Sequence, residues 1–165
     1  MPNNPSALLA EAKKHLGYVE GPKKDNPFGK WYGSNGTPWC AAFVSYCMNH
    51  SGAGALIAGA QTPKGFNSCG AGIKFFKAKH AWHPVAEAKA GDIVFFDWEH
   101  DGEQDHVGIV VSNDPKTKTV KTIEGNTSDT NHSNGGTVQA KTRNYSVIMG
   151  VGRPAWPVAA AKPAA

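Results

Sequence analysis

The feature that most constrains the fold is a change in the hydrophobic period near residue 91. Before it, apolar residues recur at helical spacing in residues 6–16, 37–52 and 69–79. After it, five segments have the alternation or apolar runs of strands: 91–98, 105–112, 118–126, 136–143 and 147–153. Helices that come first and strands that follow are typical of an α+β domain.

Capping residues predict where the first two helices begin and end. Ser6 is expected to cap the first helix. Thr37 and Pro38 suit the N-cap and first helical position of the second helix, and Gly52 suits its C-terminal end. The Gly- and Pro-rich stretch between the two helices is expected to be a long loop.

Length and composition predict one folded domain. The chain has 165 residues, close to the roughly 150 of one domain. Because 40% of the residues are hydrophobic and 18% are charged, most of the chain should fold. We expect the domain to span residues 1–153 and the Ala/Pro-rich residues 154–165 to form a tail or the start of a linker. No apolar run is long enough for membrane insertion.

The net charge and the number of cysteines limit which classes of function the sequence supports. The net charge is +4, which suits an anionic surface but is too weak to indicate nucleic acid, so we expect no nucleic-acid partner. The first residues lack the pattern of a secretory signal. Three cysteines are an odd number, which argues against a disulfide framework and directs attention to a single reactive thiol.

Cys40 is the candidate for that thiol. If Thr37 is the cap, Cys40 is the third helical residue, where free N–H groups and the helix dipole favour a thiolate. The helix alone leaves two interpretations open, a nucleophile or one more small buried hydrophobe. Cys47, two turns deeper, is interpreted as core and Cys69 as structural, and a disulfide between them stays open.

A hairpin argument brings His106 and Glu124 together. If segments 105–112 and 118–126 pair around a turn at 113–117, the numbers of paired residues sum to 230 and His106 faces Glu124. Asn126 then shares their face. A cross-strand surface pair is the alternative interpretation.

Together these residues suit nucleophilic acyl transfer. Cys40 would attack a carbonyl carbon, His106 would move the proton, and Glu124 would orient the imidazole ring. The backbone N–H of Cys40 is a candidate oxyanion donor. Asn126 would help to orient His106 or polarise the carbonyl.

Four segments in this order resemble a known family: PWCAAFVSYC, GDIVFF, DHVGIVV and IEGN. They are similar to the CHAP domain, whose members are papain-like cysteine amidohydrolases and peptidases that cut bacterial peptidoglycan. The resemblance runs from about residue 10 to residue 153. It implies a catalytic set of Cys40, His106, Glu124 and Asn126, and a papain-like α+β fold with N-terminal helices packed on a C-terminal antiparallel sheet of about five strands.

The resemblance also implies a biological setting. The start at Met1, the absent signal and the Ala/Pro tail resemble a phage endolysin, made in the host cytoplasm and acting on the bacterial cell wall. We therefore expect a peptidoglycan hydrolase that cleaves an amide bond through a thioester, acts as a monomer and needs no cofactor. Alternatives are a cellular wall-remodelling peptidase, a phage tail-associated hydrolase, and a non-catalytic wall-binding module.

The sequence also predicts which residues could bind a metal ion or the substrate. Some phage members carry an acidic calcium loop before the Cys helix, but here Asp25 is the only acid in that loop and Ala42 replaces an Asp, so no metal site of that type is expected. The acidic residues 98–105 are interpreted as a solvated loop, with a bound cation as the alternative. Aromatic residues expected to line the substrate cleft are Trp31, Tyr32, Trp39 and Trp98.

Overall fold

The computed structural model describes residues 3–158. Residues 159–165 of the expected tail therefore lie outside the described part of the chain. The described start of that tail remains close to the protein body, since Pro154 is buried and Trp156 packs against the core. Within residues 3–158, no helix is both long and apolar enough to cross a membrane.

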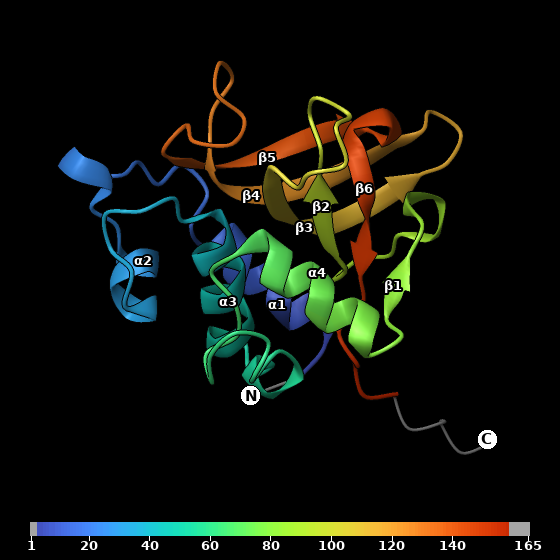
Figure 1. The fold of residues 1–165 in the computed structure, drawn as a ribbon, viewed down its shortest axis with the longest axis horizontal. Helices are drawn as coiled ribbons and strands as arrows, with labels where there is room; N and C mark the ends of the chain where they lie inside the picture. Colours follow the sequence, from blue (N-terminus) through green and yellow to red (C-terminus); the bar gives the residue numbers. More distant parts are fainter. Residues whose placement is uncertain (1–2, 159–165) are drawn as a thin grey trace.

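Four α-helices precede all six strands of the sheet, in the order that the change of period predicts (Figure 1). They are α1 (Pro5–Lys13), α2 (Pro27–Tyr32), α3 (Cys40–His50) and α4 (Cys69–Ala78). Single 3-10 turns lie at Pro22–Lys24, Gly54–Leu56, Val85–Glu87 and Tyr145–Val147.

Six strands form one antiparallel sheet in the order β1-β6-β2-β3-β4-β5. The strands are β1 (Trp82–His83), β2 (Ile93–Phe96), β3 (His106–Asp114), β4 (Thr119–Thr127), β5 (Thr137–Asn144) and β6 (Ile148–Gly152). The α+β prediction is confirmed. The sheet has one strand more than the five that the sequence predicts. The additional strand, β1, is too short to show any alternation in the sequence.

Apolar residues cover both faces of the sheet. The larger core lies between the helices and the sheet, and α3 packs against β3 and β4 (Figure 1). A smaller core on the other face includes Val94, Phe96, Val110 and Val120. Because side chains alternate along a strand, His106 and Val110 of β3 share that second face.

The N-terminal helices begin at different residues from those predicted. Asn4, not Ser6, caps α1, and its side chain accepts the N–H of Ala7 at 2.8 Å. The expected loop contains α2, which Asn26 caps and which Gly33 ends with φ of 100°. An Asn-Pro pair and a glycine six residues later are ordinary helix signals, and only the short length of α2 concealed them.

The prediction that Thr37 caps α3 is wrong. The cap is Trp39, without a side-chain hydrogen bond, and Cys40 is the first helical residue rather than the third. The Thr37 hydroxyl instead donates to the backbone oxygen of Ser34 at 2.7 Å. The correction moves Cys40 closer to the helix end, where no intrahelical acceptor exists for its N–H. Gly52 ends the helix as predicted, with φ of 87°.

The predicted register of the β3–β4 hairpin is wrong by two residues. Ile109 pairs with Ile123, so paired numbers sum to 232 near the site, and a bulge between Val110 and Ser112 changes the sum nearer the turn. A shift of two residues keeps every side chain on its predicted face, whereas a shift of one reverses it. His106 and Glu124 therefore still lie on one face, as diagonal rather than direct neighbours.

Candidate active site

Cys40 lies at the exposed end of an otherwise buried helix face. It is the first residue of α3 and 7% exposed, and Cys47 on the same helix is fully buried, as predicted. The free N–H groups of the first turn and the helix dipole favour a negative charge on the sulfur. The Ala41 N–H interacts with the thiolate and contributes to lowering its pKa.

His106 and Glu124 form a buried hydrogen-bonded pair between β3 and β4. Nε2 of His106 lies 3.0 Å from Oε1 of Glu124, and neither residue is exposed. Gly108 makes this diagonal contact possible, because a Cβ at that position would lie 2.7 Å from Cγ of Glu124. A residue with any side chain at 108 would push the carboxylate away from the imidazole.

A second glycine lets the helix approach the sheet. A Cβ on Gly125 would lie 2.6 Å from the Cβ of Phe43 and 2.9 Å from the ring of Trp39. The first turn of α3 therefore rests directly on the backbone of β4. This close packing brings the helix end that carries Cys40 to the strand ends that carry His106 and Glu124.

The interaction between Cys40 and His106 lowers the pKa of the thiol and raises the pKa of the imidazole, which favours the thiolate–imidazolium form. Burial alone would lower the pKa of His106, but its contacts with Cys40 and with Glu124 raise that pKa to about 9. Since Nε2 faces Glu124, the nitrogen left for Cys40 is Nδ1, which is buried and has no conventional hydrogen bond within the described residues. The structure therefore arranges the thiol, the imidazole and the carboxylate in that order.

Cys69 also acts on the Cys40 sulfur. The contact of its thiol, at the first residue of α4, with Cys40 is the largest cause of a Cys40 pKa well below that of an ordinary thiol. The interaction with His106 adds to the effect, against the opposing effect of burial. The same contact raises the pKa of Cys69, so Cys69 stays a protonated donor. All three cysteines are free, and no disulfide joins Cys47 to Cys69.

Glu124 has two further partners that the sequence analysis did not identify. Burial would raise its pKa, but hydrogen bonds from Arg143 and the contact with His106 lower it to about 2. The Thr122 hydroxyl donates to Oε2 of the same carboxylate. Glu124 therefore remains ionised in the interior.

Asn126 holds a loop rather than the imidazole. Its Oδ1 accepts the N–H of Gly136 at 3.0 Å, and its Nδ2 donates to Asn134 at 3.1 Å. Its backbone has φ of 56°, a left-handed conformation that Asn tolerates. The predicted role in orienting His106 has no hydrogen bond to support it, because both polar atoms bind the 127–136 loop.

The structure separates the aromatic residues predicted to line the cleft. Trp39 is fully buried, with its ring stacked on Phe28 and its Nε1 donating to Glu20 at 2.6 Å, so the prediction that it forms a cleft wall is wrong. Trp31 packs against Tyr46 and His50. Tyr46 and His50 lie six and ten positions beyond Cys40, the first residue of α3. This spacing corresponds to roughly 9 to 15 Å along the helix axis, so Trp31 packs against a part of α3 well away from Cys40.

Tyr32 and Trp98 differ in their distance from the reacting groups. Tyr32 is on α2 beside Trp31, and its hydroxyl accepts from Thr62 at 3.0 Å. Trp98 is half-buried beside the site, with its ring centre 6.0 Å from that of His106. Its Nε1 donates to Ser133, which connects the 98–105 loop to the 127–136 loop. Trp98 is therefore the predicted cleft residue that the structure places near the imidazole.

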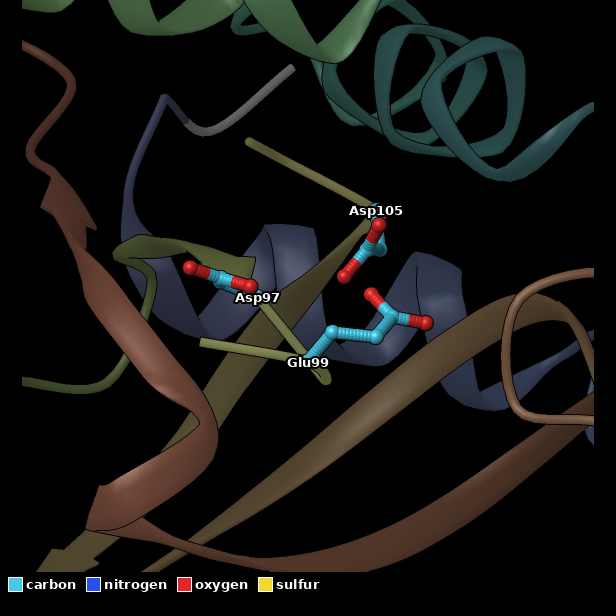
Figure 2. A group of neighbouring side chains, drawn as sticks. All are labelled: Asp97, Glu99 and Asp105. Atoms are coloured by element: carbon cyan, nitrogen blue, oxygen red, sulfur yellow. The ribbon is translucent and has the colours of Figure 1, made fainter. Parts of the chain in front are cut away.

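An acidic group precedes His106 at the same end of the sheet. Carboxylate oxygens of Asp97, Glu99 and Asp105 lie within 4.8 Å of one another (Figure 2). Asp97 accepts two backbone N–H groups of the loop, and Asp105 accepts the N–H of Trp98 at 2.6 Å. A hydrogen bond with Asp105 raises the pKa of Glu99. These contacts fold the 98–105 loop.

The loop before α3 uses its single acid in a different way. Asp25 accepts from Asn35 at 2.8 Å and forms an ion pair with Lys30 at 2.9 Å. Its carboxylate therefore stabilises the connection around α2.

The comparison with known families agrees with this geometry. Residues 31–126, more than half of the 165, match the CHAP domain, and the matched segment contains Cys40, His106 and Glu124. No curated protein matched the chain. Members of the CHAP family are cysteine- and histidine-dependent amidohydrolases or peptidases, the chemistry that the buried thiol, imidazole and carboxylate can perform. The chain belongs to the CHAP domain family.

Proposed function

We propose that this protein hydrolyses an amide bond of bacterial peptidoglycan through a covalent thioester. The observation that supports the proposal is a buried imidazole held 3.0 Å from a buried carboxylate, together with the interaction of that imidazole with the thiol at the start of α3. The low pKa of the Cys40 thiol and the raised pKa of His106 favour the thiolate–imidazolium form at neutral pH.

The proposed reaction has two steps. The Cys40 thiolate attacks the carbonyl carbon, and His106 gives its proton to the leaving nitrogen as the C–N bond breaks. A water molecule then attacks the thioester carbon, His106 accepts a proton from it, and the thiolate leaves. The N–H of Cys40, at the helix end, is positioned to stabilise the oxyanion.

Glu124 fixes the orientation of the imidazole during both steps. Its contact with Nε2 leaves Nδ1 to face the sulfur and the substrate. The rigid strand positions of both residues keep this orientation without a change in structure. Since the site is formed by α3, β3 and β4 of one chain, we propose that the protein acts as a monomer.

Turbidity of purified cell walls tests the enzyme proposal. The wild-type protein should clear the suspension, and Cys40→Ser should abolish clearing while the protein stays folded. Cys47→Ala is the matched control, because it removes a buried thiol from the same helix and should keep activity. Clearing by Cys40→Ser would remove Cys40 from the mechanism, and adhesion of the wild type without clearing would show a binding module.

Mass spectrometry of the released fragments tests which class of bond is cut. Cleavage between the lactyl group and the first alanine, within the stem peptide, or within a cross-bridge would each support an amide hydrolase. New reducing sugar ends without new amino groups would contradict it, because they show glycosidic cleavage.

We further propose that the biological setting is phage lysis from within. The match to the CHAP domain and the net charge of +4, which suits an anionic wall, support an enzyme that acts on the cell wall. When the protein is produced in a bacterial cytoplasm, lysis should follow only after the membrane is permeabilised. Lysis of cells that were not permeabilised, or the absence of lysis after permeabilisation, would contradict this biological setting. Neither result would test the proposed amide hydrolysis.

A further inference from the structure

Arg143 extends from β5 and binds the same carboxylate that orients the imidazole. Its Nε donates to Oε2 of Glu124 at 2.9 Å, and its Nη2 donates to Oε1 at 2.6 Å. His106 uses Oε1 as well, at 3.0 Å. One buried anion therefore contacts both the imidazole and the guanidinium. Arg143 lies beyond the segment 31–126 that matches the family.

The strand register explains why these groups meet. Arg143 pairs with Val120, so its side chain shares a face of the sheet with Thr122 and Glu124. With the Thr122 hydroxyl on Oε2, the carboxylate accepts four hydrogen bonds. A carboxylate has about four acceptor positions, so this one is saturated and cannot rotate freely.

The guanidinium is held away from bulk water. Arg143 is 7% exposed, and its central carbon lies 4.9 Å from the ring centre of Trp98 and 5.6 Å from that of Phe96. Its Nη1 is 3.1 Å from Nδ1 of His132, which accepts the hydrogen bond. Aromatic faces attract a cation, and the low exposure weakens solvent screening.

A count of charges shows what Arg143 contributes. A thiolate at Cys40 and an imidazolium at His106 cancel, which leaves the negative charge of Glu124 without compensation. An uncompensated buried charge is strongly unfavourable. With Arg143 included, the two anions and two cations sum to zero.

We propose that Arg143 is a positioning residue that keeps Glu124 ionised and fixed, and so keeps Cys40 and His106 in their thiolate–imidazolium form. The consequence for hydrolysis rests on the proposed function, whereas the consequence for the thiol can be measured without a substrate.

The other ionisable groups around the four residues come from several elements. Cys69 on α4 and Asp105 before β3 act near the thiol, and His132 and Lys141 lie on the side of the guanidinium. None of these groups is changed by the variants below.

The test is the alkylation rate of Cys40 by iodoacetamide as a function of pH, with the modified residue identified by peptide mass mapping. In Arg143→Met the site carries one uncompensated negative charge, which disfavours the thiolate. The titration midpoint of Cys40 should rise by about one pH unit, which makes alkylation below both midpoints about tenfold slower. An unchanged midpoint in folded Arg143→Met would overturn the proposal.

Two further variants separate charge from geometry. Arg143→Lys keeps the charge but loses the paired donors, so the midpoint should stay near that of the wild type while wall clearing slows. In a Glu124→Gln background, which lacks the carboxylate through which Arg143 acts, adding Arg143→Met should shift the midpoint far less than it does in the wild type. Equal shifts in the two backgrounds would show that Arg143 does not act through Glu124. If Arg143→Met does not fold, the test rests on Arg143→Lys. Clearing of cell walls by Arg143→Lys at the wild-type rate would contradict the positioning role of Arg143.

Arg153 provides a matched control. It binds Asp92 through two hydrogen bonds of 2.9 and 2.8 Å at another part of the sheet. Arg153→Met should change stability without moving the midpoint of Cys40, and an equal shift in this variant would count against a specific role for Arg143. If wild-type protein fails to clear walls but its thiol responds to Arg143 as expected, only the proposed function fails.

Discussion

Cys69 illustrates how a neighbouring residue sets the chemistry of a nucleophile. The sequence places Cys69 in a Gly-rich stretch, which predicts a structural role. In the structure Ser68 caps α4, and the protonated thiol of Cys69, the first residue of that helix, interacts with Cys40 and lowers its pKa. The start of a second helix therefore stabilises the anion at the start of α3.

Removal of this donor should raise the pKa of Cys40. In Cys69→Ala the thiolate loses a hydrogen bond, and alkylation of Cys40 at acidic pH should slow several-fold, on the scale of about 1 kcal/mol for one hydrogen bond. Cys69→Ser keeps a hydroxyl donor and should stay close to the wild type. Equal rates in wild type and Cys69→Ala would show that the contact does not affect the thiol.

Individual residues differ in how well the sequence predicts their roles. A helix start and a hairpin constrain Cys40, His106 and Glu124 locally, so the sequence predicts the elements on which the structure has them. Arg143 could not be found in this way, since its partner depends on the register between β4 and β5. Alternation in β5 alone does not distinguish a buried arginine from the exposed residues around it.

Among the structural elements, α3 and the β3–β4 hairpin position the site through two close approaches. Gly108 allows Glu124 to lie across β3, and Gly125 allows α3 to rest on β4. Neither approach depends on the exact pairing that the sequence suggested. The hairpin prediction succeeded at the site, although its register was wrong, because an error of two residues preserves the face of each side chain.

Gly125→Ala should separate the helix from the strand. The new methyl group would lie 2.6 Å from the Cβ of Phe43, which forces α3 away from β4. Overpacking of this kind typically costs about 1–3 kcal/mol of unfolding free energy. We expect lower thermal stability, slower wall clearing and a raised titration midpoint of Cys40.

Gly21→Ala is the control for that substitution. A methyl group there would be 3.5 Å from the nearest atom of Asp25, an ordinary contact. This variant should keep wild-type clearing and stability. Wild-type behaviour of Gly125→Ala would show that the packing of α3 on β4 does not determine the site geometry.

For the whole molecule, the buried Glu124 links stability to pH. Its pKa falls from the usual 4.5 to about 2 on folding. A lowered pKa means that the folded state favours the ionised form, so its contribution is complete above pH 4.5 and is lost as pH falls toward 2. The α+β architecture creates this dependence by placing an ion pair inside the second core.

Urea unfolding between neutral and acidic pH measures this contribution. The unfolding free energy of the wild type should decrease below about pH 4.5, and Glu124→Gln should show a shallower decrease because residue 124 no longer gains a proton. Parallel acid profiles for the two proteins would contradict the low pKa of Glu124 in the folded state.

The ion pair between Cys40 and His106 is the feature on which the proposed chemistry depends most. The direct measurement is the pH profile of Cys40 alkylation in the wild type and in His106→Ala. We predict a wild-type titration midpoint well below that of an ordinary thiol, and a clearly higher midpoint with slow alkylation at neutral pH in the variant. Identical profiles, or a wild-type midpoint near the ordinary value of about 8.5, would contradict it.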